Sequence, residues 1–362
     1  MIKYLGSKRR LVPVIAAMAS AVGARTALDM FTGTTRVAQA IKRTGATVTA
    51  VDAARYSEAF ARCYVATDGS STDRDELTAA LEHLSHLTPV RGYVTETFCE
   101  LSRFFQPFNG ERIDAIRDSI EADFSHSPLY PILLTSLLEA ADRVDSTTGV
   151  QMAYVKQWAP RSFRALELRV PELLDGPGTA IRADACAIAP KLGGFDFTYL
   201  DPPYNQHRYF TNYHVWETLI AWDAPEHYGV ACKRQDSRSE NTKSVFNSKR
   251  SMPEALAKLV GQLDCSLLVL SYNDESWLSL DELVAMCAQK DAVATLSFES
   301  ARYVGARIGI HNPLGERVGV ISHLRNHEYM VVAGERRCVD AAVTAASTVS
   351  PLSSRLLAKP GP

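Results

Sequence analysis

The chain has 362 residues, of which 46% are hydrophobic and 22% charged, and its formal net charge is −2 at pH 7. This composition is close to the average of globular domains and excludes collagen-like, disordered and disulfide-scaffold proteins. The length suits one large domain or two ordinary ones. Because the net charge is nearly zero, any surface for nucleic acid has to be a local basic patch.

Cysteine usage and hydropathy predict a cytoplasmic protein. No stretch of the sequence reaches the roughly 18 to 20 consecutive apolar residues that a membrane helix needs. The 7 cysteines are scattered and form no C-x-x-C pair, which favours reduced thiols over disulfides or a zinc site. A secretory signal is the alternative at the amino terminus, where basic residues precede the apolar run 11–24. Pro13 and the cysteine count argue against that alternative.

The first part of the chain alternates helix and strand. Helices are predicted over 8–22, around 37–41 and over 55–65, and strands over 26–30 and 47–51. Strand, helix, strand and helix within about forty residues are typical of a βαβ unit in a parallel sheet.

From Asp68 the periodicity becomes helical. After a loop at 69–72, helices are predicted over 74–87, 94–106, 111–122 and 128–143. The Gly176-Pro177-Gly178 breaker ends this segment. The sequence therefore predicts a helical insertion at 67–178, between the two parts of an α/β domain at 1–66 and 179–337.

Short strands return after the breaker. They are predicted over 180–183, 195–200, 266–270, 293–300 and 329–333, with helices beginning at Pro253 and spanning 279–289. Residues 225–251 are polar and irregular. The Ala/Ser/Thr/Pro-rich end, 338–362, is predicted to be a disordered tail.

The most informative segment is 195–204, an apolar strand that ends in Asp201-Pro202-Pro203-Tyr204. In open α/β sheets, ligands bind beyond the carboxyl ends of the strands, where these four residues fall. Because prolines stiffen the chain and lack a backbone donor, the Pro202 carbonyl stays available beside the Asp201 carboxylate. Tyr204 adds a flat aromatic face. Two acceptors and an aromatic surface suit a planar base that carries an NH2 group.

This tetrapeptide resembles the amino-methyltransferase motif, and its companions occur in the order found in adenine-specific DNA methyltransferases of the Dam and FokI-methylase type. Tyr4-Leu5-Gly6-Ser7-Lys8 is similar to their amino-terminal cofactor motif, and Asp29-Met30-Phe31-Thr32-Gly33 to their first-strand loop. Asp52 matches the acid that ends their second strand. Segments Asn205-Gln206-His207, Asn212-Tyr213-His214 and Glu217-Thr218 resemble the FokI-methylase branch.

The resemblance covers nearly all of 1–66 and 180–333 and implies a Rossmann-like methyltransferase fold. That fold is a mixed seven-stranded sheet, and here it would carry an inserted, mostly helical target-recognition domain. The segment 67–178 resembles the target-recognition domain of this family only in its position along the chain. The family loop usually has a second glycine where Thr35 stands. The absence of G-x-G-x-x-G from the sequence argues against a nicotinamide site.

The resemblance also implies S-adenosylmethionine as the methyl donor. Asp52 is expected to hold the ribose hydroxyls or to cap the helix near Arg55, and both roles could hold. Gly33 lets the loop approach the methionine moiety, and Asp29 binds the cofactor ammonium group or acts as a cap. The complete predicted cofactor set is Tyr4, Lys8, Asp29, Phe31, Gly33, Asp52, Asp184 and Asp201.

The predicted catalytic residues are Asp201, Pro202, Pro203 and Tyr204. Hydrogen bonds from the adenine NH2 to Asp201 and to the Pro202 carbonyl localise the nitrogen lone pair and stabilise positive charge as the methyl transfers. No strong base is needed, because a sulfonium methyl is already electrophilic. The adenine has to flip out of the duplex, and stacking on Tyr204 offsets part of that cost.

DNA contacts are predicted in the polar segment after the tetrapeptide, with a merely solvated loop as the alternative. The candidates are Lys233, Arg234, Arg238, Lys243, Lys249 and Arg250. A second candidate group is Arg302, Arg307, Arg317 and Arg325. His83 and His86 are three residues apart, but no further ligand completes a metal site, so no metal is expected.

The sequence thus predicts a site-specific DNA adenine methyltransferase in a restriction-modification or phage and host methylation context. Its expected partners are double-stranded DNA and a cognate restriction endonuclease encoded elsewhere, with no membrane, and its expected state is a monomer or weak dimer. The alternatives are a same-fold enzyme for an RNA base or protein amide, and a non-catalytic DNA-binding module. A dehydrogenase would require nicotinamide binding.

Overall fold

The computed structural model describes residues 2–6, 8–152, 154, 157–204, 206, 208–274, 276–301 and 325–349. The chain divides into two compact units. Unit 1 comprises Met1–Arg10, Phe31–Ala185 and His207–Ser244, and unit 2 comprises Leu11–Met30, Cys186–Gln206 and Val245–Pro362.

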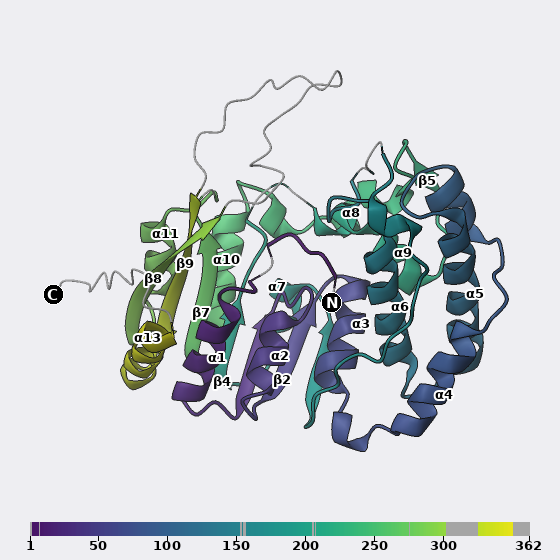
Figure 1. Ribbon diagram of the computed structural model, residues 1–362. Coiled ribbons are helices and arrows are strands. Elements are labelled where there is room, and N and C mark those ends of the chain that lie inside the picture. Colours follow the sequence, from purple (N-terminus) through teal and green to yellow (C-terminus); the bar gives the residue numbers. More distant parts are fainter. Residues whose placement is uncertain are drawn as a thin grey trace. The chain divides into compact units, whose positions relative to one another are not determined.

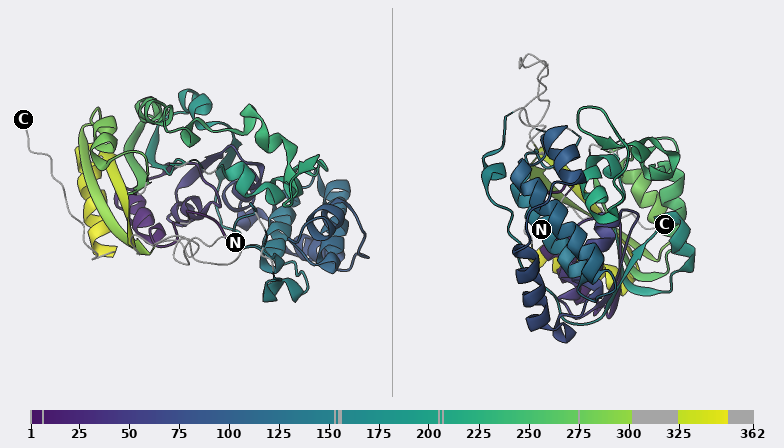
Figure 2. Two further views of the ribbon diagram at one scale, coloured as in Figure 1. Left: turned by 90° about the horizontal axis from the view of Figure 1, so that it is seen from above. Right: turned by 90° about the vertical axis from the view of Figure 1, so that its right-hand side faces the viewer.

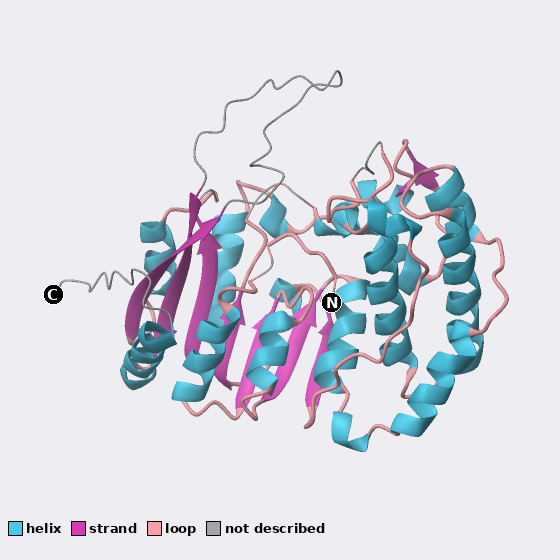
Figure 3. Cartoon of the chain, viewed as in Figure 1, coloured by secondary structure: helices cyan, strands magenta, loops and turns pink. Residues whose placement is uncertain are grey.

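The main sheet has seven strands in the order β3-β2-β1-β4-β7-β9-β8 (Figures 1 and 3). The strands are β1 (Thr26–Met30), β2 (Thr47–Asp52), β3 (Gly178–Arg182), β4 (Phe195–Leu200), β7 (Cys265–Asn273), β8 (Ala292–Ala301) and β9 (Arg325–Gly334). Strand β4 runs parallel to both β1 and β7, and β2 runs parallel to β3. Strand β9 is antiparallel to β7 and β8. The predicted mixed seven-stranded α/β fold is confirmed.

The central strands of unit 2 are buried on both faces. Strand β7 is an almost uninterrupted apolar run whose last seven residues are all buried, and the last four residues of β4 are buried as well. Parallel strands covered on both faces have this continuous rather than alternating pattern. The tetrapeptide 201–204 therefore follows directly on a strand that the core holds in place.

Unit 1 contains most of the predicted helices. They are α2 (Arg36–Lys42), α3 (Arg55–Ala61), α4 (Arg74–Ser85), α5 (Pro107–Phe124), α6 (Tyr130–Val144), α8 (Tyr209–Asn212) and α9 (His214–Ala221), with π-helical turns η1 (Arg62–Ala66) and η3 (Thr95–Glu100). Asp73 caps α4 by accepting from the backbone N–H groups of Asp75 and Glu76. Prolines at the first positions of α5 and α6 set their starts.

The helix predicted over 94–106 is wrong in extent. Within it, the helical residues are Val94 and the π-helical turn Thr95–Glu100, and Pro107 opens the next helix. The Asp114 carboxylate takes the backbone N–H groups of Gly92, Val94 and Thr95 at 2.8–3.0 Å. This side-chain acceptor satisfies backbone donors at the start of the short helical segment.

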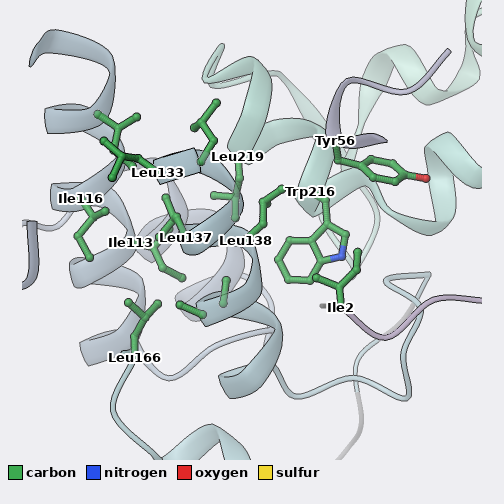
Figure 4. Packing of buried hydrophobic residues seen from close by; sticks show 14 of the residues in the cluster. Ile2, Tyr56, Ile113, Ile116, Leu133, Leu137, Leu138, Leu166, Trp216 and Leu219 are labelled. Atoms are coloured by element: carbon green, nitrogen blue, oxygen red, sulfur yellow. The ribbon is translucent and has the colours of Figure 1, made fainter. Parts of the chain in front are cut away.

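The hydrophobic core of unit 1 joins the predicted insertion to its neighbours. Figure 4 shows Ile113 of α5 and Leu137 of α6 in the same cluster as Trp216 of α9 and Tyr56 of α3. Because one core crosses the predicted boundaries, the compact units do not follow the 67–178 division. The role of this segment in reading DNA stays a prediction.

Unit 2 adds α1 (Val12–Ala21), α10 (Met252–Gln262), α11 (Leu280–Cys287) and α13 (Arg336–Val349). Helix α13 packs against α1 (Figures 1 and 2). The disordered tail predicted from 338 is therefore wrong for 338–349, and 350–362 lie outside the described residues. Buried Val339, Ala342, Val343 and Ala346 give α13 an apolar face at helical spacing, which the Ala/Ser/Thr composition concealed.

The apolar run near the amino terminus forms α1, whose Val14, Ile15, Met18 and Ala19 are buried. The interpretation of this run as a buried helix is confirmed. The helix begins at Val12 rather than at residue 8, with Pro13 in its first turn. None of the helices in the described ranges combines the length and the apolar character that crossing a membrane requires.

Shorter elements complete the chain. They are α7 (Ala185–Ile188), the hairpin strands β5 (His227–Tyr228) and β6 (Lys233–Arg234), and the 3-10 turns η2 (Gly69–Ser71), η4 (Pro160–Phe163), η5 (Ala189–Lys191), η6 (Gln235–Arg238), η7 (Glu240–Thr242) and η8 (Val245–Asn247). The segment 225–251, predicted as irregular, consists of this hairpin and single turns. Such turns leave polar side chains at the surface.

Candidate active site

In unit 1, Asp52 connects two segments of the predicted cofactor site. Its Oδ2 accepts a hydrogen bond from the Gly33 N–H at 2.9 Å, and its Oδ1 accepts one from the Ala54 N–H at 3.0 Å. The carboxylate thus holds both the loop after β1 and the turn into α3. Burial raises the pKa of Asp52, whereas the backbone donors lower it. Each carboxylate oxygen can accept more than one hydrogen bond.

The loop after β1 has an unusual backbone. Phe31, Gly33 and Thr35 have φ values of 68°, 52° and 61°, in the left-handed region that favours glycine. A Cβ added to Gly33 would lie 3.1 Å from Cε1 of Tyr4, so glycine is required for this close approach as well as for its φ. Backbone strain of this kind persists only where surrounding contacts enforce it, and it is frequent at functional sites.

Thr35, which stands where the family usually has a second glycine, keeps the left-handed conformation. Its Oγ1 donates to the Thr34 carbonyl at 2.7 Å and accepts from Gln39 Nε2 at 2.9 Å. Both Thr35 and Gln39 are buried. These two hydrogen bonds compensate for the cost of a β-branched residue at positive φ, so the departure from the family pattern leaves the loop conformation intact.

Tyr4 lies in a cluster of tyrosines. Its ring stacks on Tyr213 with centroids 4.7 Å apart and on Tyr209 with centroids 5.5 Å apart. Its hydroxyl lies 3.2 Å from that of Tyr56. Within unit 1, the structure therefore brings Tyr4, Gly33 and Asp52 together, and their binding of a cofactor stays a prediction.

Glu217 is a buried acid beside this cluster. Its Oε1 accepts a hydrogen bond from the Tyr56 N–H at 3.3 Å, and its Oε2 lies 3.8 Å from Nη1 of Arg55. Burial raises the pKa of Glu217 to about 7. In the sequence, Glu217 belongs to a motif that resembles the FokI-methylase branch, and it has no predicted role. The feature that could have revealed one is an acidic residue among the apolar residues of a short helix, because a buried carboxylate is tolerated only when hydrogen bonds or an opposite charge compensate it.

The other predicted cofactor residues of unit 1 are less informative. Lys8 is buried, Phe31 is half-buried, and Ser7 lies outside the described residues. Asp184 is exposed and stands after the last residue of β3, Arg182, rather than at the end of that strand. Its membership of the cofactor set stays a prediction.

In unit 2, the predicted catalytic residues follow a strand that is paired with β1. Asp29 lies opposite Tyr199, and Met30 lies opposite Leu200. Because the strands are parallel, buried Asp29 and the start of the 201–204 segment lie at the same edge of the sheet. Asp201–Tyr204 form no regular secondary structure. Asn205 and His207 lie outside the described residues.

Tyr204 is held by a second tyrosine. Its ring meets that of Tyr272 edge to face, with centroids 5.6 Å apart and an interplanar angle of 64°. Tyr272 is completely buried near the end of β7. Since Tyr204 itself is only half-buried, this contact fixes one edge of the ring and leaves part of its surface accessible.

Arg234 corrects the predicted DNA-contact set. It is only 2% exposed, and its guanidinium group contacts the carboxylates of Asp223 and Asp236 at 2.7–3.1 Å. Together with a hydrogen bond from Nη1 to Thr218 Oγ1 at 3.4 Å, these contacts use all five N–H donors of the guanidinium group, so none is left for a phosphate. The prediction that Arg234 contacts DNA is therefore wrong, and the residue is structural.

The other basic candidates are accessible to different degrees. Arg238 is exposed and lies 3.8 Å above the ring centroid of Tyr228. Lys243 pairs with Glu240, and Lys233 is half-buried. Lys249 and Arg250, in unit 2, are exposed. The tip of the β5–β6 hairpin carries Val230, which is 79% exposed.

The second group of candidate arginines lies mostly outside the described residues. Arg302, Arg307 and Arg317 lie outside the described residues, and the backbone of Arg325 begins β9. His83 and His86 are exposed on and after α4. Among the residues that the structure describes, no group of three or more histidine, cysteine or acidic side chains has the arrangement of a metal site.

Comparison with known proteins identifies the family. The profile of the D12 class N6 adenine-specific DNA methyltransferases matches residues 4–286. The type II methyltransferase M.NlaIII of Neisseria lactamica is 30% identical over 296 residues, which cover 77% of this chain and 86% of that protein. The modification methylase StsI of Streptococcus sanguinis is 28% identical over 299 residues, 78% of this chain and 45% of that protein.

A further relative has a shorter match. The type II methyltransferase M.FokI of Planomicrobium okeanokoites is 30% identical over 186 residues, 50% of this chain and 28% of that protein. The chain thus spans most of M.NlaIII and less than half of StsI and M.FokI. The family profile includes Tyr4, the Asp52 loop and the 201–204 tetrapeptide. The chain therefore belongs to the D12 class N6 adenine-specific DNA methyltransferases.

Proposed function

We propose that this DNA adenine methyltransferase transfers a methyl group from S-adenosylmethionine to the N6 amino group of a flipped adenine in a specific double-stranded site. The observation that carries the proposal is the position of Asp201-Pro202-Pro203-Tyr204 directly after buried β4, with Asp29 at the same edge of the sheet. Ligands of open α/β sheets bind at this edge.

The residues of unit 1 fit the proposed methyl donor. Asp52 offers carboxylate oxygens for the ribose hydroxyls, and Gly33 offers a backbone without a side chain for close approach. Tyr4 adds an aromatic face, and Lys8 supplies a positive charge suited to the carboxylate of a methionine moiety. When bound, S-adenosylmethionine supplies an electrophilic sulfonium methyl.

The tetrapeptide accounts for recognition of the acceptor. The Asp201 carboxylate and the Pro202 carbonyl accept hydrogen bonds from the adenine NH2, which localises the nitrogen lone pair and stabilises developing positive charge. Asp201 or solvent then takes the proton. The ring of Tyr204, which contacts Tyr272 edge to face, stacks on the base. This stacking offsets part of the free energy needed to flip the adenine.

The relatives suggest the biological context. M.NlaIII and M.FokI are named type II methyltransferases, and StsI is named a modification methylase. We therefore propose that this chain modifies duplex DNA within a restriction-modification system, with a cognate endonuclease as partner. A monomer or weak dimer is the proposed state. The accessible cations Arg238, Lys243 and Lys249 are the proposed phosphate contacts.

Methylation of defined DNA tests the function. The protein is expressed in a host without DNA methylases, and the host DNA is sequenced with a method that detects N6-methyladenine. Methylated adenines in one short sequence motif are expected for the wild type and none for Asp201→Ala. Transfer only to RNA or protein in a parallel assay with labelled S-adenosylmethionine, or retained turnover in a folded Asp201→Ala variant, would overturn the proposal.

A further inference from the structure

We propose that Tyr213 and Glu217, one turn apart at the start of α9, are positioning residues that hold two separate segments of the S-adenosylmethionine site. The inference rests on the proposed function and assigns the two residues no contact with the reacting atoms. The two side chains have a fixed spacing, because the Glu217 N–H donates to the Tyr213 carbonyl at 3.0 Å. One helical turn therefore reaches both segments.

Tyr213 holds the amino-terminal segment. Its hydroxyl accepts a hydrogen bond from the Leu5 N–H at 2.6 Å, and its ring stacks on that of Tyr4 at an interplanar angle of 16°. Tyr213 is completely buried, so its own position is fixed by the core. Because Tyr4 lies against Gly33, a shift of Tyr4 changes the space beside the cofactor loop.

Glu217 holds the segment that follows Asp52. It accepts from the Tyr56 N–H at 3.3 Å, near the amino terminus of α3, and pairs with Arg55. A carboxylate at a helix amino terminus satisfies a free backbone donor and interacts favourably with the helix dipole. The same turn contains the Ala54 N–H that binds Asp52, so Glu217 helps fix the direction of the proposed ribose acceptor.

Helix α9 is itself anchored at its far end. Arg117 of α5, which is buried, donates from Nε to the Leu219 carbonyl at 2.7 Å and from Nη2 to the Ile220 carbonyl at 3.1 Å. These carbonyls belong to the last turn of α9, where intrahelical donors are missing. The helix is therefore held at both ends, as a positioning element requires.

The test measures affinity for S-adenosylmethionine by calorimetry and methyl transfer at saturating cofactor. Tyr213→Phe keeps the ring and removes the hydroxyl; Glu217→Ala removes the acceptor, and Glu217→Gln restores an acceptor oxygen. We expect about tenfold weaker cofactor binding for Tyr213→Phe and Glu217→Ala, with kcat at saturation within about twofold of the wild type. Glu217→Gln should recover most of the affinity.

Matched controls separate positioning from general stability. Tyr64 donates its hydroxyl to Glu139 at 2.6 Å, and Asp114 caps η3, so Tyr64→Phe and Asp114→Ala remove hydrogen bonds of buried side chains elsewhere in unit 1. These variants should unfold at lower temperature and bind the cofactor normally. Equal loss of affinity in the controls, or normal affinity in both Tyr213→Phe and Glu217→Ala, would overturn the inference. If Glu217→Ala does not fold, Tyr213→Phe decides the question.

The wild-type protein distinguishes this inference from the proposed function. If the wild type does not bind S-adenosylmethionine, the proposed function fails. If it binds the cofactor and methylates DNA but the variants match it, only the positioning role fails.

Discussion

The Asp52 carboxylate accepts a hydrogen bond from the Gly33 N–H at 2.9 Å, so the acid that ends β2 holds the loop that follows β1. The same carboxylate holds the turn into α3 through the Ala54 N–H. Asp52 therefore has a structural task in addition to the proposed contact with ribose. The sequence also allowed Asp52 to be the N-cap of the helix near Arg55. The structure agrees in part, because Asp52 accepts a hydrogen bond from the turn before α3, but Ala54 occupies the N-cap position.

Replacing Asp52 with alanine should impair both stability and cofactor binding. Two partly buried backbone donors lose their acceptor, which costs about 1–3 kcal/mol of unfolding free energy. Loss of the ribose acceptor should weaken cofactor binding by tenfold or more. The control is Asp68→Ala, because Asp68 similarly accepts from the Ser70 and Gly176 N–H groups at 2.9 and 3.0 Å. Unchanged cofactor affinity in Asp52→Ala would contradict the assignment.

Gly33→Ala should be more harmful than an equivalent substitution in another turn. A Cβ at Gly33 would meet the Tyr4 ring at 3.1 Å, whereas a Cβ at Gly45 meets nothing within 4 Å, and both glycines have positive φ. Each alanine costs about 1 kcal/mol or more for its backbone conformation. Only Gly33→Ala should also weaken S-adenosylmethionine binding in calorimetry. Equal affinities of the two variants would show that the Tyr4 contact does not matter.

The sequence predicts the sheet and the motif positions well because both follow from local patterns. The apolar run Phe195–Leu200 is a strand with those bounds, and the strand predicted over 47–51 extends through Asp52. Local patterns fail where partners come from distant residues. Arg234 lies in a basic, polar segment, but it pairs with Asp223, and α13 has the composition of a tail, but it packs against α1.

Glu217→Gln should remove part of the pH dependence of stability. Burial raises the pKa of Glu217 from 4.5 to about 7, although Arg55 and Arg234 oppose that rise. The folded state therefore keeps a proton that the unfolded state has lost, and unfolding free energy falls as pH increases from about 4.5 to 7. Complete ionisation of Glu217 in the folded state lowers the unfolding free energy by about 3 kcal/mol. Other titrating groups, Asp142 among them, are common to both proteins.

The measurement is chemical denaturation of the wild type and Glu217→Gln at several pH values. The unfolding free energy of Glu217→Gln minus that of the wild type should increase as pH rises through this window, and it should level off above pH 7. A constant difference between pH 4.5 and 7 would place the pKa of Glu217 near its ordinary value.

Arg234 and Lys249 should respond to substitution in opposite ways. Arg234→Ala leaves two carboxylates without their buried partner and should cost about 2 kcal/mol of stability, while the salt dependence of DNA binding stays the same. Lys249→Ala, at an exposed position, should leave stability unchanged and lower the slope of log K against log salt by about 0.9. A lower slope for Arg234→Ala at full stability would restore Arg234 to the DNA interface.

Tyr204→Ala should impair methylation of duplex DNA more than methylation of a target adenine placed in a mismatch. Extrusion of a paired base costs a few kcal/mol, and loss of about 1–3 kcal/mol of stacking lowers the flipped population directly. An unpaired adenine is extruded at little cost, so its flipped state stays populated without the tyrosine. The measurement is the ratio of kcat/KM on duplex DNA to kcat/KM on the mismatched substrate, which should fall about tenfold.

Tyr204→Phe keeps the ring, and Tyr272→Phe keeps the edge-to-face partner, so both control variants should preserve the ratio. If Tyr204→Ala lowers both rates equally, the ring supports the tetrapeptide through Tyr272 and does not stack on an extruded base.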